Sequence, residues 1–211
     1  MIVIIDYGLG NLRSILNMLE KLGVSAAISN NIEEIEQANR IILPGVGAFD
    51  TAMNNINKLG LLEILNQKVV KQKTPILGIC LGMQLLAKSS QEGKMPGLGW
   101  VDAEVVRFSF PGEKDLKLKI PHMGWNEVEP TGESHFFPEA GAEYRYYFVH
   151  SYYMICKNHQ DSIGITHHGL DFTSVVMREN ILGFQFHPEK SHKFGIELLK
   201  RFTTWDPGAN R

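Results

Sequence analysis

The sequence predicts an α/β protein in which helices cover a mostly parallel central sheet and antiparallel strands are added to that sheet. Two observations carry the prediction. The first half of the chain alternates short apolar runs with amphipathic stretches, as parallel strands joined by helices do. From about Gly97 the pattern changes to short alternating segments between turn residues, which is typical of antiparallel strands.

The first strand and helix are the clearest elements. Residues 2–6 form an apolar run, and leucine and isoleucine then recur over 12–22 at the spacing of one helix face. Asn11 is expected to cap the start of this helix, and Gly23 stands where a left-handed residue ends a helix.

The same reasoning places the remaining elements of the first half. We expect strands at 24–28, 40–43 and 75–79, a short helix at 32–38, and helix from about 50 to 71 with a break near Gly60. The strand at 75–79 ends directly at Cys80.

The second half is expected to hold short strands and a final helix at 193–203. The expected strands are 104–110, 116–120, 126–128, 143–149, 152–156, 163–166, 173–177 and 181–186. No linker or repeat divides the chain, so we predict one domain over 1–205 and a frayed tail at 206–211.

Composition excludes several classes of protein. The 211 residues carry a net charge of −2 with no basic stripe, which argues against nucleic acid as a partner. No apolar run reaches the roughly 20 residues of a membrane helix, and the first residues lack the features of a signal peptide. With only Cys80 and Cys156 available for disulfides, we expect a cytoplasmic protein that does not bind membranes.

The segment Gly78-Ile79-Cys80-Leu81-Gly82 has the pattern of a nucleophile elbow with cysteine in the place of serine. Such a turn between strand and helix is tight, so neighbours with a Cβ would clash. The helix start favours a thiolate, and the N–H of Leu81 is free to hold an oxyanion. The alternative is a structural cysteine between packing glycines, as we expect for Cys156.

A thiol nucleophile needs a base, and His187 is the best candidate among eight histidines. It follows an apolar strand, at the sheet edge where α/β proteins place their sites. Glu189 is close enough in sequence to orient the imidazole. A structural histidine is the alternative. His167 and His168 lack a zinc-binding pattern, so no metal site is predicted.

Two glycine-rich turns follow strands in the first half. In the turn at 43–49, Gly45 and Gly47 let a peptide plane reorient and aim an N–H at a neighbouring site. The turn after the first strand suggests dinucleotide binding, but Arg13 replaces the third glycine of that motif. The chain also lacks a P-loop sequence, and we predict no cofactor.

Together the elbow, the turn at 44–47 and the pair His187 and Glu189 resemble the class I (triad) glutamine amidotransferases. The resemblance implies a flavodoxin-like three-layer fold with a mostly parallel sheet. It also implies that glutamine is hydrolysed through a cysteine thioester. By this resemblance the catalytic residues are Cys80, His187 and Glu189, and the oxyanion hole is formed by Val46, Gly47 and Leu81.

Segments 5–12, 121–126 and 147–153 resemble one branch of that family, the glutaminase subunits of imidazole glycerol phosphate synthases. These subunits form a heterodimer with a HisF-type (β/α)8 cyclase, which uses the ammonia to make imidazole glycerol phosphate and AICAR. The resemblance implies that L-glutamine is bound by Gln84, Glu92, His150, Ser151 and Tyr152. It implies that the cyclase is met by Asn11, Met123, Trp125 and Lys190.

Some positions depart from the branch and leave alternatives open. Ala87-Lys88 and the segment 167–169 differ from its pattern, and 99–104 resembles paralogues that supply ammonia for sugar amidination in surface glycans. That sugar-directed paralogue is one alternative. A cysteine hydrolase or peptidase acting alone is another, although such an enzyme needs no partner-facing segments.

Overall fold

A computed structural model describes residues 1–110, 118–139 and 142–208 of the chain. Its main sheet begins with five parallel strands in the spatial order β2, β1, β3, β4, β13. Their bounds are β1 Ile2–Ile5, β2 Ala26–Ser29, β3 Arg40–Gly45, β4 Ile76–Cys80 and β13 Ile181–Phe184. Cys80 therefore ends the fourth strand of a parallel block.

Antiparallel strands extend this sheet beyond β13, in the order β12, β10 and β6, with β5 parallel to β6 at the far edge and β11 pairing with β12 and β8. A separate two-stranded sheet is formed by β7 and β9. The bounds are β5 Ser89–Ser90, β6 Ala103–Arg107, β7 His122–Glu127, β8 Glu129–Pro130, β9 Arg145–His150, β10 Tyr152–Cys156, β11 Ser162–His167 and β12 Asp171–Arg178.

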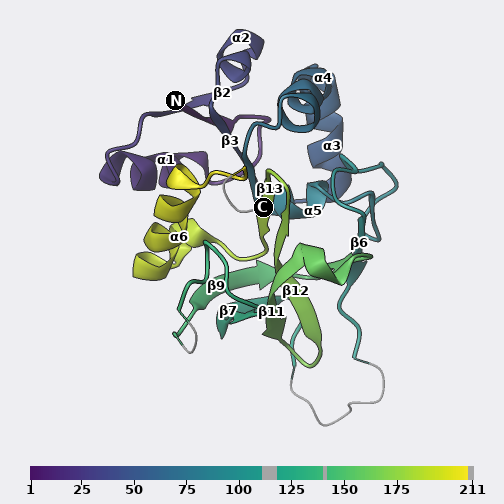
Figure 1. Ribbon diagram of the computed structural model, residues 1–211. Coiled ribbons are helices and arrows are strands. Elements are labelled where there is room, and N and C mark those ends of the chain that lie inside the picture. The colour runs from purple at the N-terminus through teal and green to yellow at the C-terminus, as the bar shows by residue number, and fades with distance from the viewer. Residues whose placement is uncertain (111–117, 140–141, 209–211) are drawn as a thin grey trace.

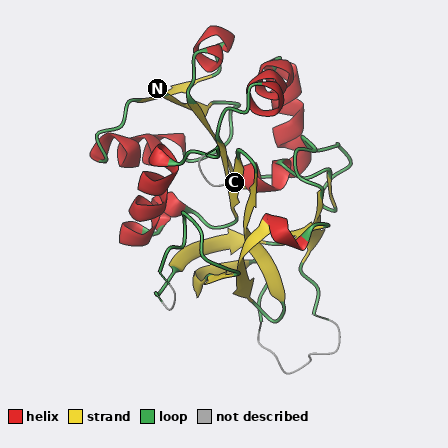
Figure 2. Ribbon diagram, viewed as in Figure 1, coloured by secondary structure: helices red, strands yellow, loops and turns green. Residues whose placement is uncertain are grey.

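Helices cover both faces of the parallel strands, as Figures 1 and 2 show. The α-helices are α1 Leu12–Lys21, α2 Ile32–Glu36, α3 Phe49–Lys58, α4 Leu61–Asn66, α5 Leu81–Leu85 and α6 His192–Thr204. Shorter helical turns are the π-helical η1 Gln67–Lys71 and the 3₁₀ turns η2 His159–Asp161 and η3 Pro188–Lys190. Among the described residues, no helix has the length and apolar character needed to cross a membrane.

The strands divide their side chains between two cores, which makes the three layers. Alternate residues of a strand point to opposite faces. In β1, Val3 and Ile5 pack in the core shared with α3, α4 and α5, whereas Ile2 and Ile4 pack in the core shared with α1 and α6. The three-layer fold with a mostly parallel sheet is the one that the sequence predicts.

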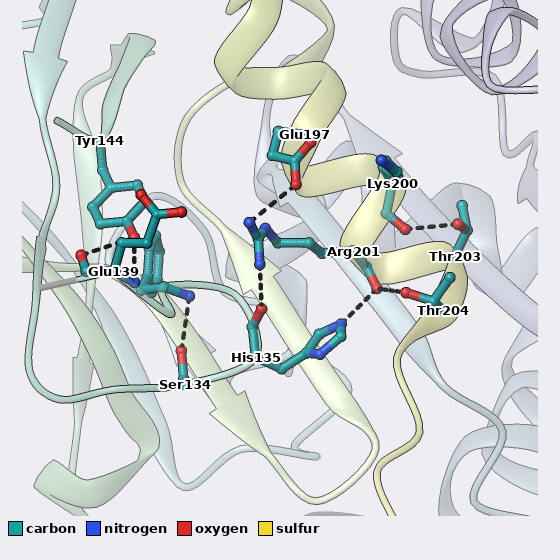
Figure 3. A network of polar contacts seen from close by, with 10 residues as sticks. Ser134, His135, Glu139, Tyr144, Glu197, Lys200, Arg201, Thr203 and Thr204 are labelled. Atoms are coloured by element: carbon teal, nitrogen blue, oxygen red, sulfur yellow. Dashed lines mark hydrogen bonds and ion pairs between the residues drawn. The ribbon is translucent and has the colours of Figure 1, made fainter. Parts of the chain in front are cut away.

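The C-terminal helix is tied to the segment before β9, as Figure 3 shows. Arg201 donates to the carbonyl of His135 at 3.2 Å, and the His135 ring nitrogen lies 3.0 Å from the carbonyl oxygen of Arg201. Glu197 pairs with Arg201 at 3.0 Å. The last turns of α6 are therefore anchored to the segment around His135.

Most expected elements are present, with shifted ends. Gly23 has φ +70° after α1, and the helical stretch breaks around Gly60. Asn11 occupies the N-cap position, but its Oδ1 accepts from the Ser14 hydroxyl instead of a backbone N–H, so the capping expectation is wrong.

Two expected strands and the expected tail differ in the structure. The strand expected at 126–128 lies earlier, as β7, because residues from His122 onward pair with β9. No strand is found at 118–120, and 116–117 lie outside the described residues. The expected tail has neither helix nor strand over 206–208, while 209–211 lie outside the described part.

Candidate active site

Cys80 stands at a strained turn between β4 and α5. It is the last residue of the strand and directly precedes the helix, and its φ and ψ are 53° and −110°. A positive φ is unfavourable for a residue with a side chain and is found where the surrounding structure enforces it, often at functional sites. The strand–turn–helix geometry of a nucleophile elbow is therefore present.

The glycines on either side of Cys80 permit this turn by close packing. A Cβ on Gly82 would lie 1.8 Å from the carbonyl oxygen of Leu43, and one on Gly78 would lie 2.7 Å from the carbonyl oxygen of Gly82. Neither contact is possible for a real side chain, so α5 begins directly against the backbone of β3.

His187 and Glu189 form a buried pair next to the elbow. Nδ1 of His187 lies 2.8 Å from Oε1 of Glu189, and the two side chains are 2% and 1% exposed. The backbone of His187 is held on both sides, because its N–H donates to the Tyr147 carbonyl and its carbonyl accepts from the Ser191 hydroxyl. The other ring nitrogen, Nε2, is buried and has no hydrogen-bond partner among the described residues.

The surroundings of His187 favour the imidazolium. Burial acts to lower its pKa, but the interactions with Cys80 and then with Glu189 outweigh burial and raise the pKa to about 10. A protonated histidine beside a cysteine is the arrangement that stabilises a thiolate.

A cavity of about 350 Å³ opens above Cys80. It brings together eleven of the residues that the sequence singles out: Val46, Gly47, Cys80, Leu81, Gln84, Glu92, His150, Ser151, Tyr152, His187 and Lys190. Pro121 and Val149 also line it, and no sequence argument names these two individually. Glu189 lies behind His187, and the other predicted residues Asn11, Met123 and Trp125 lie outside the cavity.

Two backbone segments offer N–H groups near the sulfur. Leu81 is the first residue of α5, so its N–H has no acceptor within the helix. The end of β3 lies alongside Cys80, with Gly45 as its partner in register, and Val46 and Gly47 follow at the cavity wall. Gly47 has φ +107°, a conformation that suits glycine.

Tyr7 is a residue of this region that sequence reasoning missed. Its buried hydroxyl donates to the carbonyl of Pro44, directly before the segment that carries Gly47. Burial, and then the charge of Cys80, raise its pKa, so the hydroxyl stays protonated and remains a donor. Tyr7 lies within the segment 5–12 that carries part of the family resemblance, but only the fold brings it to Pro44.

Gln84 and Glu92 are held by hydrogen bonds at the cavity wall. Nε2 of Gln84 donates to the Tyr152 carbonyl at 3.0 Å and to Oε1 of Gln185 at 3.1 Å. Oε2 of Glu92 accepts from the N–H of Phe49 at 2.9 Å, at the start of α3. Both side chains are therefore fixed before any ligand arrives.

Two of the four residues expected to meet a partner form an exposed patch on β7. Met123 is 62% exposed and Trp125 is 38% exposed. The Trp125 ring stacks on His192 with centroids 5.5 Å apart. Nζ of Lys190 lies 5.7 Å from the centre of the Tyr147 ring, which itself meets Trp125 edge-on. Asn11 lies at the start of α1, a helix that packs against η3.

Within the described residues, no group of three or more histidine, cysteine or acidic side chains is arranged to hold a metal ion. Cys156 is buried and its thiol pKa is raised to about 11, chiefly by burial. These properties fit the structural role expected for Cys156 and distinguish it from Cys80.

The sequence matches the family described as glutamine amidotransferase class-I over residues 3–204. The chain belongs to that family. The amidotransferase is 50% identical over 202 residues to imidazole glycerol phosphate synthase subunit HisH 2 of Pseudomonas aeruginosa, covering 96% of this chain and 98% of that protein. The protein of the same name from Methanococcus maripaludis is 51% identical with the same coverage. Subunit HisH of Bdellovibrio bacteriovorus is 47% identical over 204 residues, 96% of this chain and 99% of that protein.

Solved structures confirm the fold of the amidotransferase. A crystal structure described as a glutamine amidotransferase superimposes with a TM-score of 0.70 at 21% identity, covering 95% of this chain and 96% of the other. A glutamine amidotransferase from Thermotoga maritima gives a TM-score of 0.62 at 19% identity, covering 99% of this chain and 86% of the other. These likenesses support the predicted three-layer fold.

Proposed function

We propose that this amidotransferase is the glutaminase subunit of an imidazole glycerol phosphate synthase. It would hydrolyse L-glutamine to glutamate and ammonia and pass the ammonia to a HisF-type (β/α)8 cyclase in histidine biosynthesis. The observation that carries the proposal is the cavity lined together by Cys80, His187 and the expected oxyanion and substrate residues. The name and high identity of the HisH relatives support the pathway.

In the first half of the reaction, the Cys80 thiolate attacks the side-chain carboxamide carbon of glutamine. The tetrahedral oxyanion receives hydrogen bonds from the N–H of Leu81 and from the Val46–Gly47 segment. When the carbon–nitrogen bond breaks, the His187 imidazolium gives its proton to the departing nitrogen, which leaves as ammonia. The raised pKa of His187 supports this order, because the proton is already on the imidazole.

In the second half, water hydrolyses the γ-glutamyl thioester. Neutral His187 takes a proton from the water, whose oxygen attacks the thioester carbon. The new carbon–oxygen bond replaces the carbon–sulfur bond. Cys80 leaves as a thiolate beside a reprotonated His187, and glutamate departs. Throughout, Glu189 holds the imidazole by Nδ1 and so keeps Nε2 on the side of the sulfur.

Glutamine would lie between the elbow and the turn at residues 150–152. Gln84, Glu92 and the backbone of His150, Ser151 and Tyr152 line the same cavity and are the proposed binding groups. The 350 Å³ cavity is at the small end of ligand pockets, which suits a single amino acid.

The partner would cover the exposed apolar side of β7. Met123 and Trp125 are large apolar side chains left open to solvent, and Lys190 reaches from the cavity wall to the Tyr147 ring beside them. We propose these residues, with Asn11, as the face that meets the cyclase. We also propose a cytoplasmic location, because the mechanism needs Cys80 as a free thiol.

A second candidate is ammonia supply to a sugar amidotransferase for surface glycans. The segment 99–104, which resembles paralogues that supply ammonia to such enzymes, supports this candidate. The chemistry at Cys80 would be the same, and only the partner and the acceptor would differ.

The test is reconstitution with the HisF-type cyclase from the same genome. We expect Cys80→Ala to abolish glutamine-dependent synthesis and to leave ammonia-dependent synthesis intact, since external ammonia bypasses the thioester. Cys156→Ala serves as the control and should keep both activities. A Cys80→Ala protein that still uses glutamine would contradict the assignment of the nucleophile.

The acceptor of the ammonia is identified by comparing glutamine hydrolysis with different partner proteins. We expect glutamine hydrolysis by the wild-type chain to rise when the cyclase and its ribonucleotide substrate are added. A rise only with a sugar amidotransferase from the same genome would favour the second candidate. Full activity of the chain alone would favour a cysteine hydrolase that needs no partner.

A further inference from the structure

A row of buried polar side chains begins on β7 and leads inward. His122 and His150 are partners in the β7–β9 register, and Nδ1 of His122 lies 2.9 Å from Nε2 of His150. On the inner side, Nδ1 of His150 lies 2.7 Å from the carbonyl oxygen of Tyr152. On the outer side, Nδ2 of Asn126 lies 3.1 Å from Nε2 of His122.

The direction of these hydrogen bonds follows from their inner end. A carbonyl oxygen only accepts, so Nδ1 of His150 carries a proton. In a neutral His150, Nε2 is then an acceptor, and Nδ1 of His122 must be the donor. Nε2 of a neutral His122 in turn accepts from the Asn126 amide. Every bond in the row donates inward, and both histidines have the Nδ1–H tautomer.

The surroundings keep both histidines neutral. Burial lowers the pKa of His122 to about 4 and that of His150 to about 3, and the nearby charge of His168 acts in the same direction. The His168 ring stacks on His122 with centroids 4.2 Å apart. The charges of His122 and His187 also disfavour a charge on His150, and together with burial they outweigh the hydrogen bond to the Tyr152 carbonyl, which favours it. Apolar rings, including Phe108 and Phe172, complete the enclosure.

The row continues beyond Tyr152 as far as the nucleophile. The Tyr152 carbonyl also accepts from Nε2 of Gln84, whose second amide hydrogen goes to Oε1 of Gln185. Gln185 is fully buried, and its Nε2 lies 3.9 Å from Sγ of Cys80. We call this continuous series the polar chain: Asn126, His122, His150, the Tyr152 carbonyl, Gln84, Gln185 and Cys80.

We propose that His122, His150 and Gln185 are positioning residues for glutamine hydrolysis. His122 and His150 hold the Tyr152 carbonyl where Gln84 can donate to it. Because both amide hydrogens of Gln84 are then occupied, only its Oε1 remains to bind a ligand, and it selects an N–H group such as the glutamine carboxamide or ammonium. Gln185 in turn directs an N–H at the sulfur, which stabilises the thiolate. This inference rests on the proposed glutaminase function.

Two variants of His122 test the outer end of the polar chain, in the full-length protein with its partner. Losing a buried hydrogen bond of this kind should raise the KM for glutamine about tenfold in His122→Leu, with little change in kcat. His122→Asn keeps a donor near the place of Nδ1 and should restore most of the affinity. Equal KM values for the two variants, or a wild-type KM in His122→Leu, would overturn the role of His122.

Gln185→Met tests the inner end of the polar chain, next to Cys80, in an assay that does not use glutamine. It removes both bonds of Gln185 while keeping its length, and we expect alkylation of Cys80 by iodoacetamide at neutral pH to slow about tenfold. Unchanged alkylation would overturn the role of Gln185. This assay still decides the matter if the chain proves not to be a glutaminase.

Thr166→Val is the matched control. It removes the buried 2.8 Å hydrogen bond between the Thr166 and Ser174 hydroxyls, which lies outside the polar chain. We expect a loss of stability but a wild-type KM and alkylation rate. If the control raises KM as much as His122→Leu, the effect is one of general packing and the proposal fails.

Nitrogen NMR of the wild-type protein tests the histidines without any substitution and so does not depend on how well a variant folds. At about pH 6, where an unperturbed histidine is largely protonated, His122 and His150 should both be neutral in the Nδ1–H form. An imidazolium or an Nε2–H tautomer at either position would overturn the proposed direction of the hydrogen bonds from Asn126 to the Tyr152 carbonyl.

Discussion

Nδ1 of His187 lies 2.8 Å from Oε1 of Glu189, and both side chains are shielded almost wholly from solvent. The carboxylate therefore fixes which ring nitrogen faces the elbow, and Nε2 is left for proton transfer. A pair only two residues apart achieves this because η3 turns the chain back immediately after His187.

Because His187 transfers the proton and Glu189 orients it, substitutions at the two positions should lower kcat to different extents. We expect kcat for glutamine hydrolysis to fall further in His187→Ala than in Glu189→Gln, by at least about tenfold, because the first loses the proton carrier and the second only its orientation. Steady-state kinetics with saturating glutamine provide the measurement. Equal or reversed losses would show that the roles are assigned wrongly.

The free energy of unfolding should depend on the His187 proton. Folding raises the pKa of His187 from 6.5 to about 10, so the folded state binds this proton more tightly. The resulting stability is fully present below about pH 6.5 and is lost as the pH rises through about 10. We expect the difference in urea midpoint between wild type and His187→Gln to shrink over this range. A His159→Gln variant, in which an exposed histidine is replaced, provides the control for the loss of a histidine as such.

Gly82→Ala should destabilise the fold by more than about 3 kcal/mol, because its Cβ would overlap the Leu43 carbonyl and neither backbone can move freely. Gly132→Ala is the matched control, since a Cβ there meets nothing within 4 Å, and we expect it to stay within about 0.5 kcal/mol of wild type. Urea denaturation measures both. A small effect at Gly82 would contradict the close packing of α5 on β3.

Gly47→Ala should change basal and partner-stimulated hydrolysis unequally. A Cβ on Gly47 has room, but the φ of +107° is strained for alanine, so the substitution shifts the preference of the peptide plane. We expect the stimulated rate to fall by about a hundredfold, the effect of losing one oxyanion donor, and the basal rate to fall less. Gly23→Ala introduces similar strain at the end of α1 and should leave the ratio of the two rates unchanged.

Elements with a strong local pattern could be predicted from the sequence. The spacing of apolar residues predicts α1, and the glycines around Cys80 predict the elbow, because both features depend only on residues that are close together in the sequence. The contact of His187 with Glu189 was predictable for the same reason, since only two positions separate them.

Long-range pairing could not be predicted in this way. β7 contains a glycine and follows a proline, so its own sequence does not predict that it pairs with β9. The buried polar groups Tyr7 and His122 acquire their partners only from distant segments. Gln185 did leave a signal, as a polar residue between Phe184 and Phe186 in an apolar strand, and that anomaly identifies a buried side chain with a specific partner.

The pairing of β13 with β4 has a consequence for biosynthesis of the enzyme. Cys80 is translated well before the strand beside it, which leads to His187. Until that strand inserts, the thiol has neither its base nor the amide of Gln185 near it. The unfinished polypeptide is therefore a poor nucleophile, and its reactivity begins only when the centre of the sheet closes.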